Sequence, residues 1–152
     1  MKIVIGSDHA GDTYKRAIAK HLESTGHSIT LVGSTGPERF DYPLASDAVA
    51  HTIEKSEADC GILICGSGIG VSIRANRYPF IRAALCTSEE MAQLAREHNH
   101  ANVLCLGERI IDLDIALSIV DRFLNTEPDN GVRHLHRVEL LGTKIDSDCQ
   151  SQ

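Results

Sequence analysis

Apolar and polar positions alternate along the chain with two different periods. Short runs rich in β-branched residues, which are typical of buried strands, are each followed by a longer stretch with apolar residues at helical spacing. Five such pairs in succession predict an α/β protein in which helices cover both faces of a parallel sheet. The predicted strands are residues 2–6, 28–32, 60–64, 81–85 and 103–106, and the helices that follow them are residues 12–25, 44–56, 69–77, 88–98 and 112–125.

A sixth helix is predicted over residues 133–145, after a breaker-rich loop at residues 125–131. No predicted strand follows it, so its apolar side needs another surface on which to pack. The apolar positions at helical spacing are Leu135, Val138, Leu141 and Ile145.

Length and composition indicate one domain. A chain of 152 residues, 42% of them hydrophobic, is long enough for one well-packed core and short for two. We assign this domain to residues 1–145 and expect the polar residues 146–152 to form a disordered tail.

The net charge excludes some classes of partner. The formal charge is −6 and the pI is near 5.7, whereas nucleic acids and anionic membranes select a basic surface. No apolar run approaches the roughly 20 residues that span a bilayer, and the chain opens on a predicted strand instead of a charged leader. We therefore expect a cytoplasmic protein with no nucleic-acid or membrane partner.

The cysteine pattern argues against disulfides and metal. The five cysteines are an odd number, no two form a C-x-x-C pair, and four fall in or beside apolar runs. The motif His134-x-His136 has no obvious partner ligands. We expect reduced thiols and no metal site.

The loop that begins at Cys65 is the first candidate for chemistry. It follows the apolar run 61–64 and carries glycines at alternate positions, Gly66, Gly68 and Gly70, before a predicted helix. Such a loop lets the backbone approach a ligand, and the N–H groups at the helix start attract an anion. A thiol beside this cradle suggests chemistry on a developing oxyanion. The alternative is a small buried residue followed by an ordinary tight turn.

Other polar clusters also lie at the ends of predicted elements. Residues 7–11 follow the first strand, residues 107–109 follow the fifth, and residues 97–102 end the helix before the fifth strand. Ligands of open α/β sheets bind beyond the carboxyl ends of the strands. We therefore expect one rim of the sheet to gather an acid, imidazoles, the thiol and an arginine.

These motifs, in this order, resemble the ribose-5-phosphate isomerase B family, within a wider group of allose- and galactose-6-phosphate isomerases. The resemblance runs from residue 1 to about residue 140. It implies a three-layer α/β/α Rossmann-like sandwich with a five-stranded parallel sheet and an extra C-terminal helix, a homodimer or dimer of dimers, and a role in the pentose phosphate pathway. The motifs span residues 6–11, 41–43, 64–70, 96–99, 102–104, 106–109 and 133–137.

The resemblance also implies an activity: interconversion of ribose 5-phosphate and ribulose 5-phosphate through an enediolate, with no metal or organic cofactor. Cys65 matches the base that moves a proton between C2 and C1, and His98 matches the residue that opens the sugar ring. The resemblance implies that each site is built across the dimer, with Cys65 of one chain facing His98 of the other. Another branch of the family uses a glutamate where this chain has Val71, so the chain resembles the cysteine type. Read without the resemblance, His98 would be a solvated histidine at a helix end.

The remaining matches are to substrate-binding positions. Asn99 and Asp8 match contacts to hydroxyl groups, and His9 matches a contact to hydroxyl or phosphate. The three arginines match a phosphate clamp, for which guanidinium geometry is suited. Tyr42 matches a position near the site without a defined role. The complete substrate-binding set is Asp8, His9, Gly66, Ser67, Gly68, Ile69, Gly70, Asn99, Arg109, Arg133 and Arg137.

Three other functions place similar residues in similar positions. A tyrosine-phosphatase-like site needs an arginine where Val71 stands, and the glycine spacing of residues 66–70 does not fit the G-x-G-x-x-G of a nucleotide-binding module. An isomerase of a hexose 6-phosphate, of the allose or galactose type, stays open because a pentose and a hexose differ by one carbon. Galactose-6-phosphate isomerases divide these residues between two different subunits. This chain carries the cysteine, the histidine and the arginines together, so we expect it to be self-sufficient.

Overall fold

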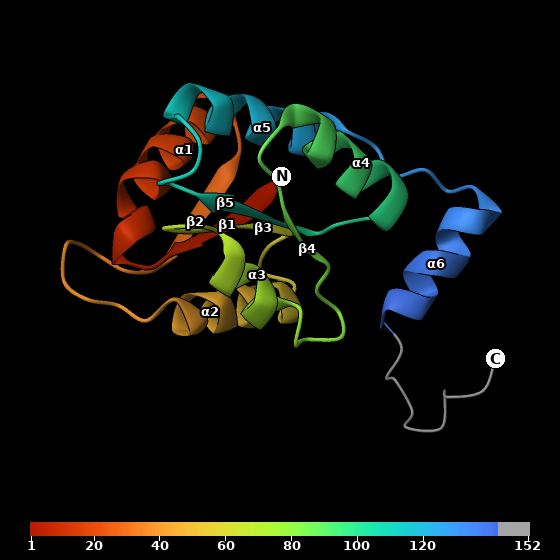
Figure 1. Ribbon diagram of the computed structural model, residues 1–152, viewed down its shortest axis with the longest axis horizontal. Helices are drawn as coiled ribbons and strands as arrows, with labels where there is room; N and C mark the ends of the chain where they lie inside the picture. Colours follow the sequence, from red (N-terminus) through yellow and green to blue (C-terminus); the bar gives the residue numbers. More distant parts are fainter. Residues whose placement is uncertain (143–152) are drawn as a thin grey trace.

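Five parallel strands form one sheet in the order β2-β1-β3-β5-β4 (Figure 1). The computed structural model describes residues 1–142. The predicted tail 146–152 and the end of the last predicted helix, residues 143–145, lie outside the described residues. The strands are β1 (Lys2–Ser7), β2 (Ser28–Gly33), β3 (Cys60–Cys65), β4 (Ala83–Leu85) and β5 (Val103–Gly107).

Helices cover both faces of the sheet, which confirms the predicted α/β/α arrangement. Helices α1, α4 and α5 lie on one face and α2 and α3 on the other (Figure 1). The connections that lead along the sheet toward β4 cross one face, and the connections that lead back cross the other face. This is the arrangement that right-handed crossovers produce. None of the helices within residues 1–142 is long and apolar enough to span a membrane. The helices are α1 (Asp12–Ser24), α2 (Tyr42–Glu54), α3 (Ile69–Ala75), α4 (Glu89–Asn99) and α5 (Leu113–Asn125).

The core lies on both sides of the central strand β3. All six of its residues are buried. Ile62 and Ile64 point into the cluster under α1, α4 and α5, while Leu63 and Cys65 point into the cluster under α2 and α3. A strand buried on two faces needs apolar side chains at every position, which explains the uninterrupted apolar run in the sequence.

Strand β4 is shorter than the predicted 81–85, because side chains satisfy the backbone around its start. The Arg82 N–H donates to Asn102 Oδ1 at 2.8 Å, so this residue is held by an amide instead of a strand. Asn76 donates from Nδ2 to the Ala83 carbonyl at 2.9 Å and accepts from the Ala83 N–H at 2.8 Å. Its amide therefore pairs with the outer edge of the sheet as a short strand would.

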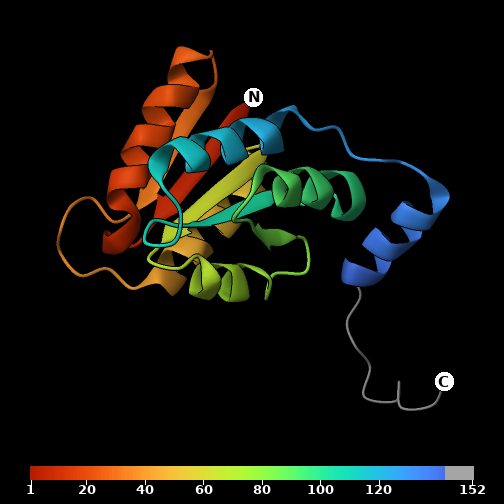
Figure 2. The same ribbon diagram turned by 45° about the horizontal axis from the view of Figure 1, so that its top comes forward.

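The last helix, α6 (Val132–Gly142), stands apart from the sheet at the end of an extended connection (Figure 2). The connection is tied to the last turn of α4, where the Asp129 N–H donates to the Glu97 carbonyl at 3.0 Å. Leu140 and Leu141 are 58% and 57% exposed. The predicted sixth helix is confirmed, and much of its apolar side remains uncovered within the described chain.

Candidate active site

Cys65 ends the central strand at the carboxyl edge of the sheet. Its side chain is 4% exposed, and the Gly68 N–H donates to Sγ at 3.1 Å. A backbone donor aimed at sulfur stabilises negative charge there. The structure thus places the predicted thiol inside the glycine loop, with the loop's own backbone as its partner.

The glycine loop packs too tightly for side chains. Gly68 has φ +76°, and a Cβ there would lie 2.9 Å from the Leu106 carbonyl carbon. A Cβ on Gly70 would lie 2.6 Å from Cε2 of Tyr42, so this tyrosine borders the loop. Ile69 and Gly70 open α3, whose first N–H groups have no carbonyl partner within the helix. Ser67 Oγ accepts from the Ile69 N–H at 3.3 Å.

The end of β5 fixes the loop from the adjacent strand. The Glu108 N–H donates to the Cys65 carbonyl and the Arg109 N–H to the Gly66 carbonyl, both at 3.0 Å. The Arg109 side chain lies against Gly66, because a Cβ on that glycine would be 3.4 Å from Nη1. Arg109, predicted as part of a phosphate clamp, therefore lies beside the cradle.

The end of β1 brings Asp8 and His9 to the same edge. Asp8 Oδ1 accepts from the N–H groups of Ala10 at 2.9 Å and Gly11 at 3.0 Å, which caps a short 3-10 helix, η1 (His9–Gly11). The sequence analysis did not predict this helix. Oδ2 has no hydrogen bond within the described residues. His9 Nδ1 lies 3.3 Å from both N and O of Phe40, so the β2–α2 loop orients its ring.

The other cysteines in the described chain are structural. Burial raises the pKa of Cys60 to about 11 and that of Cys86 to about 11. Burial raises the pKa of Cys105 well above its usual value. A raised pKa disfavours the thiolate, which is the reactive form of a cysteine. Cys65 differs from them by its place at the carboxyl edge and its N–H donor.

The expectation that one rim gathers all the polar clusters is wrong for a single chain. Helix α4 starts after β4 at the carboxyl edge and returns to the start of β5, so His98 and Asn99 lie at the amino edge. Its 11 residues span about 16 Å, too far for a proton to pass between His98 and Cys65 of one chain. Arg133 and Arg137 are on α6, which contacts α4.

The residues around His98 include His134, to which no role was assigned from the sequence. The ring of His134 stacks on that of His98, with centroids 4.6 Å apart and planes at 9°. Arg133 Nε lies 3.0 Å from His134 Nε2. The hydrogen bond from the Gly131 N–H holds the pKa of Asp129 below its usual value, and partial burial opposes this effect. Asp129 Oδ2 lies 3.5 Å from His134 Nε2. His134 stands inside the motif of residues 133–137, which was the available signal.

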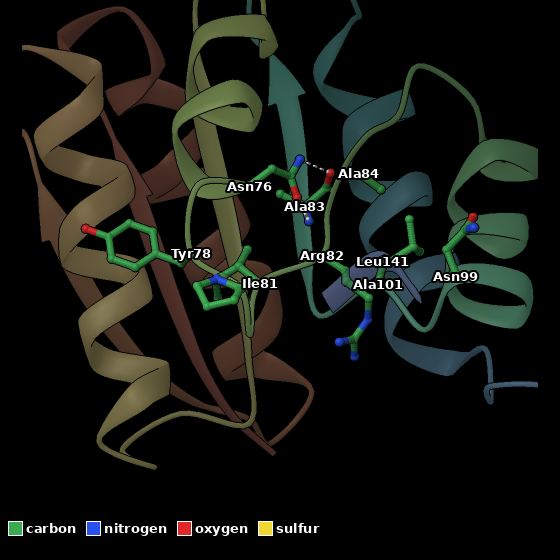
Figure 3. Close-up of a pocket in the computed structure, with 10 residues that line it drawn as sticks. Asn76, Tyr78, Ile81, Arg82, Ala83, Ala84, Asn99, Ala101 and Leu141 are labelled. Carbon is green, nitrogen blue, oxygen red and sulfur yellow. Dashed lines mark hydrogen bonds between the residues drawn. The ribbon is translucent and has the colours of Figure 1, made fainter. Parts of the chain in front are cut away.

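A pocket of about 390 Å³ lies between the edge strand β4 and the end of α4 (Figure 3). It includes Asn99 but no residue of the Cys65 loop. Among residues 1–142, no group of three or more His, Cys, Asp or Glu is arranged to hold a metal ion. The pocket is lined by Asn76, Tyr78, Pro79, Ile81, Arg82, Ala83, Ala84, Asn99, Ala101 and Leu141.

Known proteins share both the sequence and this architecture. Residues 3–141 match the model of the family described as Ribose/Galactose Isomerase. Ribose-5-phosphate isomerase B of Escherichia coli strain K12 is 43% identical over 140 residues, covering 92% of this chain and 93% of that protein. Ribose-5-phosphate isomerase B of Clostridium thermocellum superposes with a TM-score of 0.91 at 50% identity, covering 93% of this chain and 95% of that one. The type B ribose 5-phosphate isomerase of Trypanosoma brucei gives a TM-score of 0.89 at 42% identity, covering 93% and 96%.

The fold and the loop at its carboxyl edge define the class as an α/β isomerase. The chain belongs to the ribose/galactose isomerase family.

Proposed function

We propose that the protein interconverts ribose 5-phosphate and ribulose 5-phosphate, with Cys65 as the base. The observation that carries this proposal is the buried Cys65 thiol inside a glycine loop, with a backbone N–H 3.1 Å from Sγ. Relatives across most of the chain's length bear the name ribose-5-phosphate isomerase B, which supports the choice of substrate.

The proposed step transfers a proton within the sugar. The Cys65 thiolate takes the proton from C2 of the open-chain aldose, and an enediolate forms across C1 and C2. The same proton returns to C1, while the hydroxyl proton on O2 moves to O1, so no oxidant or reductant takes part. Backbone N–H groups of residues 66–70 surround the oxygen that becomes charged, and each well-placed donor contributes roughly 10²–10³ in rate.

The proposed site is completed by a second copy of the chain. His98 would open the sugar ring, and Asn99, Arg133 and Arg137 would hold hydroxyl groups and phosphate, yet these residues lie across the sheet from Cys65. In a two-fold dimer, the Cys65 loop of each chain can lie against the His98 group of its partner. Pairing of two such homodimers into a dimer of dimers would leave both shared sites unchanged.

Exposed apolar residues lie beside both halves of the proposed site and give a reason for pairing. Ile69 and Ile73 of α3, next to the glycine loop, are 52% and 53% exposed, and Leu140 and Leu141 of α6 are exposed to a similar extent. Two-fold symmetry would bury α6 of each chain against α3 of the other and cover both surfaces at once. We propose this contact as the dimer interface.

We further propose that the protein acts in the cytoplasm, in the pentose phosphate pathway. A reducing compartment suits its free thiols. The free cysteines of the described chain are Cys60, Cys65, Cys86 and Cys105.

A substrate panel tests the proposed function. Purified protein is expected to act on ribose 5-phosphate faster than on allose 6-phosphate or galactose 6-phosphate, at an unchanged rate with EDTA, because the proposed base and clamp need no cation. Initial rates on each sugar, with and without chelator, check this. Faster turnover of a hexose phosphate would reassign the substrate, and loss of activity in EDTA that a divalent ion restores would refute the metal-free mechanism.

The phosphate clamp is tested by Arg137→Ala. This variant is expected to raise KM for ribose 5-phosphate at least tenfold with kcat nearly unchanged, because the guanidinium grips phosphate equally in ground and transition states. The rate on unphosphorylated ribose should not change. Arg122→Ala is the control, since Arg122 pairs with Glu89 on the outer surface of α4 and α5. An unchanged KM in Arg137→Ala would indicate that this arginine is a solvated surface residue that does not bind the phosphate.

A further inference from the structure

His134 is a buried side chain to which the proposed reaction gives no part. It is 3% exposed, although it lies on a helix whose other described residues are mostly exposed. One face of its ring covers the ring of His98, with the planes nearly parallel at 9° and the centroids 4.6 Å apart. The proposed ring-opening group therefore rests on a second, covered imidazole.

The His134 ring is held by one hydrogen bond and bordered by a carboxylate. Arg133 Nε lies 3.0 Å from Nε2, and because an arginine N–H can only donate, Nε2 accepts in this contact. A carboxylate oxygen can only accept, so Asp129 Oδ2, 3.5 Å from the same nitrogen, is a neighbour and not a second hydrogen-bond partner. Asp129 is itself fixed, since Oδ1 accepts from the Gly131 N–H at 2.7 Å and its own N–H donates to the Glu97 carbonyl at 3.0 Å. Arg133 thus holds the ring from α6, and Asp129 borders it from the turn after α4.

Stability does not account for an imidazole at this position. His134 Nδ1 is buried and has no hydrogen-bond partner within residues 1–142. A buried polar atom without a partner is unfavourable, and an apolar side chain would avoid that cost. The flat ring against His98 is the feature that a leucine would not supply.

We propose that His134 is a positioning residue whose ring holds the His98 imidazole in the orientation that opens the sugar ring. The proposal rests on the proposed function of His98. Rotation about the terminal side-chain bond of a histidine is otherwise broad, and proton transfer needs a nitrogen within hydrogen-bond reach of the sugar oxygens. A stacked neighbour removes this freedom before substrate binds.

Ring opening determines which sugars the test compares. It removes the proton from the C1 hydroxyl and returns one to the ring oxygen as the bond between C1 and that oxygen breaks. Ribose 5-phosphate needs this step. In the shorter aldose erythrose 4-phosphate, the hydroxyl that would close a five-membered ring on C1 carries the phosphate, so this sugar is already open.

The experiment compares kcat/KM on these two aldoses. His134→Leu is expected to lose roughly tenfold in kcat/KM with ribose 5-phosphate, because a small misplacement of a reacting group costs this much or more. With erythrose 4-phosphate it should stay within twofold of the parent. His134→Phe keeps a flat ring and should stay within threefold with both sugars. His136→Leu, the same change at an exposed histidine two residues along α6, should have no effect.

A double mutant shows whether His134 acts through His98. In a His98→Ala background, His134→Leu should cause no further loss, because its only target is gone. Equal losses with both sugars, or an additional loss in the double mutant, would overturn the inference. If His98→Ala itself lost the same factor with both sugars, the proposed role of His98 would fail and the inference with it. Should the leucine variant not fold, His134→Gln makes the same comparison without a flat ring.

Discussion

Cys65→Ala is expected to reduce the rate of isomerisation by at least about 10³, within the range that a positioned acid or base contributes. The reason is that the thiol is proposed to carry the proton between C2 and C1, and alanine has no group that can do so. Folding and binding should survive, since the change removes one sulfur atom. Initial rates with ribose 5-phosphate measure the loss of activity. The melting temperature, and its shift when the same sugar is added, measure folding and binding.

Two variants make this result specific. Cys65→Ser keeps the shape and a hydrogen-bond acceptor for the Gly68 N–H, but its hydroxyl is far less acidic, so it should be nearly as inactive. Cys60→Ala removes a buried thiol from the opposite end of the same strand and should keep its activity, with a loss of stability of about 1 kcal/mol. A Cys65→Ala enzyme within tenfold of the parent would contradict the assignment of the base.

Mixing two inactive variants is expected to restore activity. When Cys65→Ala and His98→Ala chains are unfolded together and refolded, random pairing makes half of the dimers mixed. In a two-fold dimer with shared sites, each mixed dimer has one site that lacks both groups and one that has both. Half of the dimers then have half of their sites intact, so activity should reach about a quarter of the parent's.

The control for this experiment is each variant refolded alone, which should stay inactive. Differently tagged chains show, by capture on one tag, that mixed dimers have formed. If they form and no activity returns, both groups belong to one chain and the shared site is refuted.

The sequence predicted the layers of the fold well, because parallel strands buried on two faces leave an unmistakable apolar run. All five strands, their helices and the sixth helix are confirmed, with ends shifted by a few residues. The errors occur where side chains replace backbone partners. Asn102 takes the Arg82 N–H and shortens β4, and Asp8 caps the unpredicted helix η1.

The candidate site was predictable in kind but not in arrangement. Cys65, the glycine loop, Asp8, His9 and Arg109 follow strands, and a parallel sheet brings strand ends together. His98 ends a helix, and the pattern of element ends grouped it with them although a crossover helix ends at the opposite edge. Only the family resemblance implied that His98 faces Cys65 from a partner chain. His134 was passed over because its partners, Asp129 and His98, come together only through the fold.

The strand order has a consequence for the order in which the molecule can be built. Strand β5 lies between β3 and β4, and within residues 1–142 β4 pairs with no other strand. While the ribosome is still making residues before 103, the nascent chain can assemble only β2, β1 and β3, and one side of β3 stays open. The carbonyls of Cys65 and Gly66 meet their donors on Glu108 and Arg109 only when β5 slides into that opening. The backbone hydrogen bonds that shape the Cys65 loop therefore cannot form before β5 has been made.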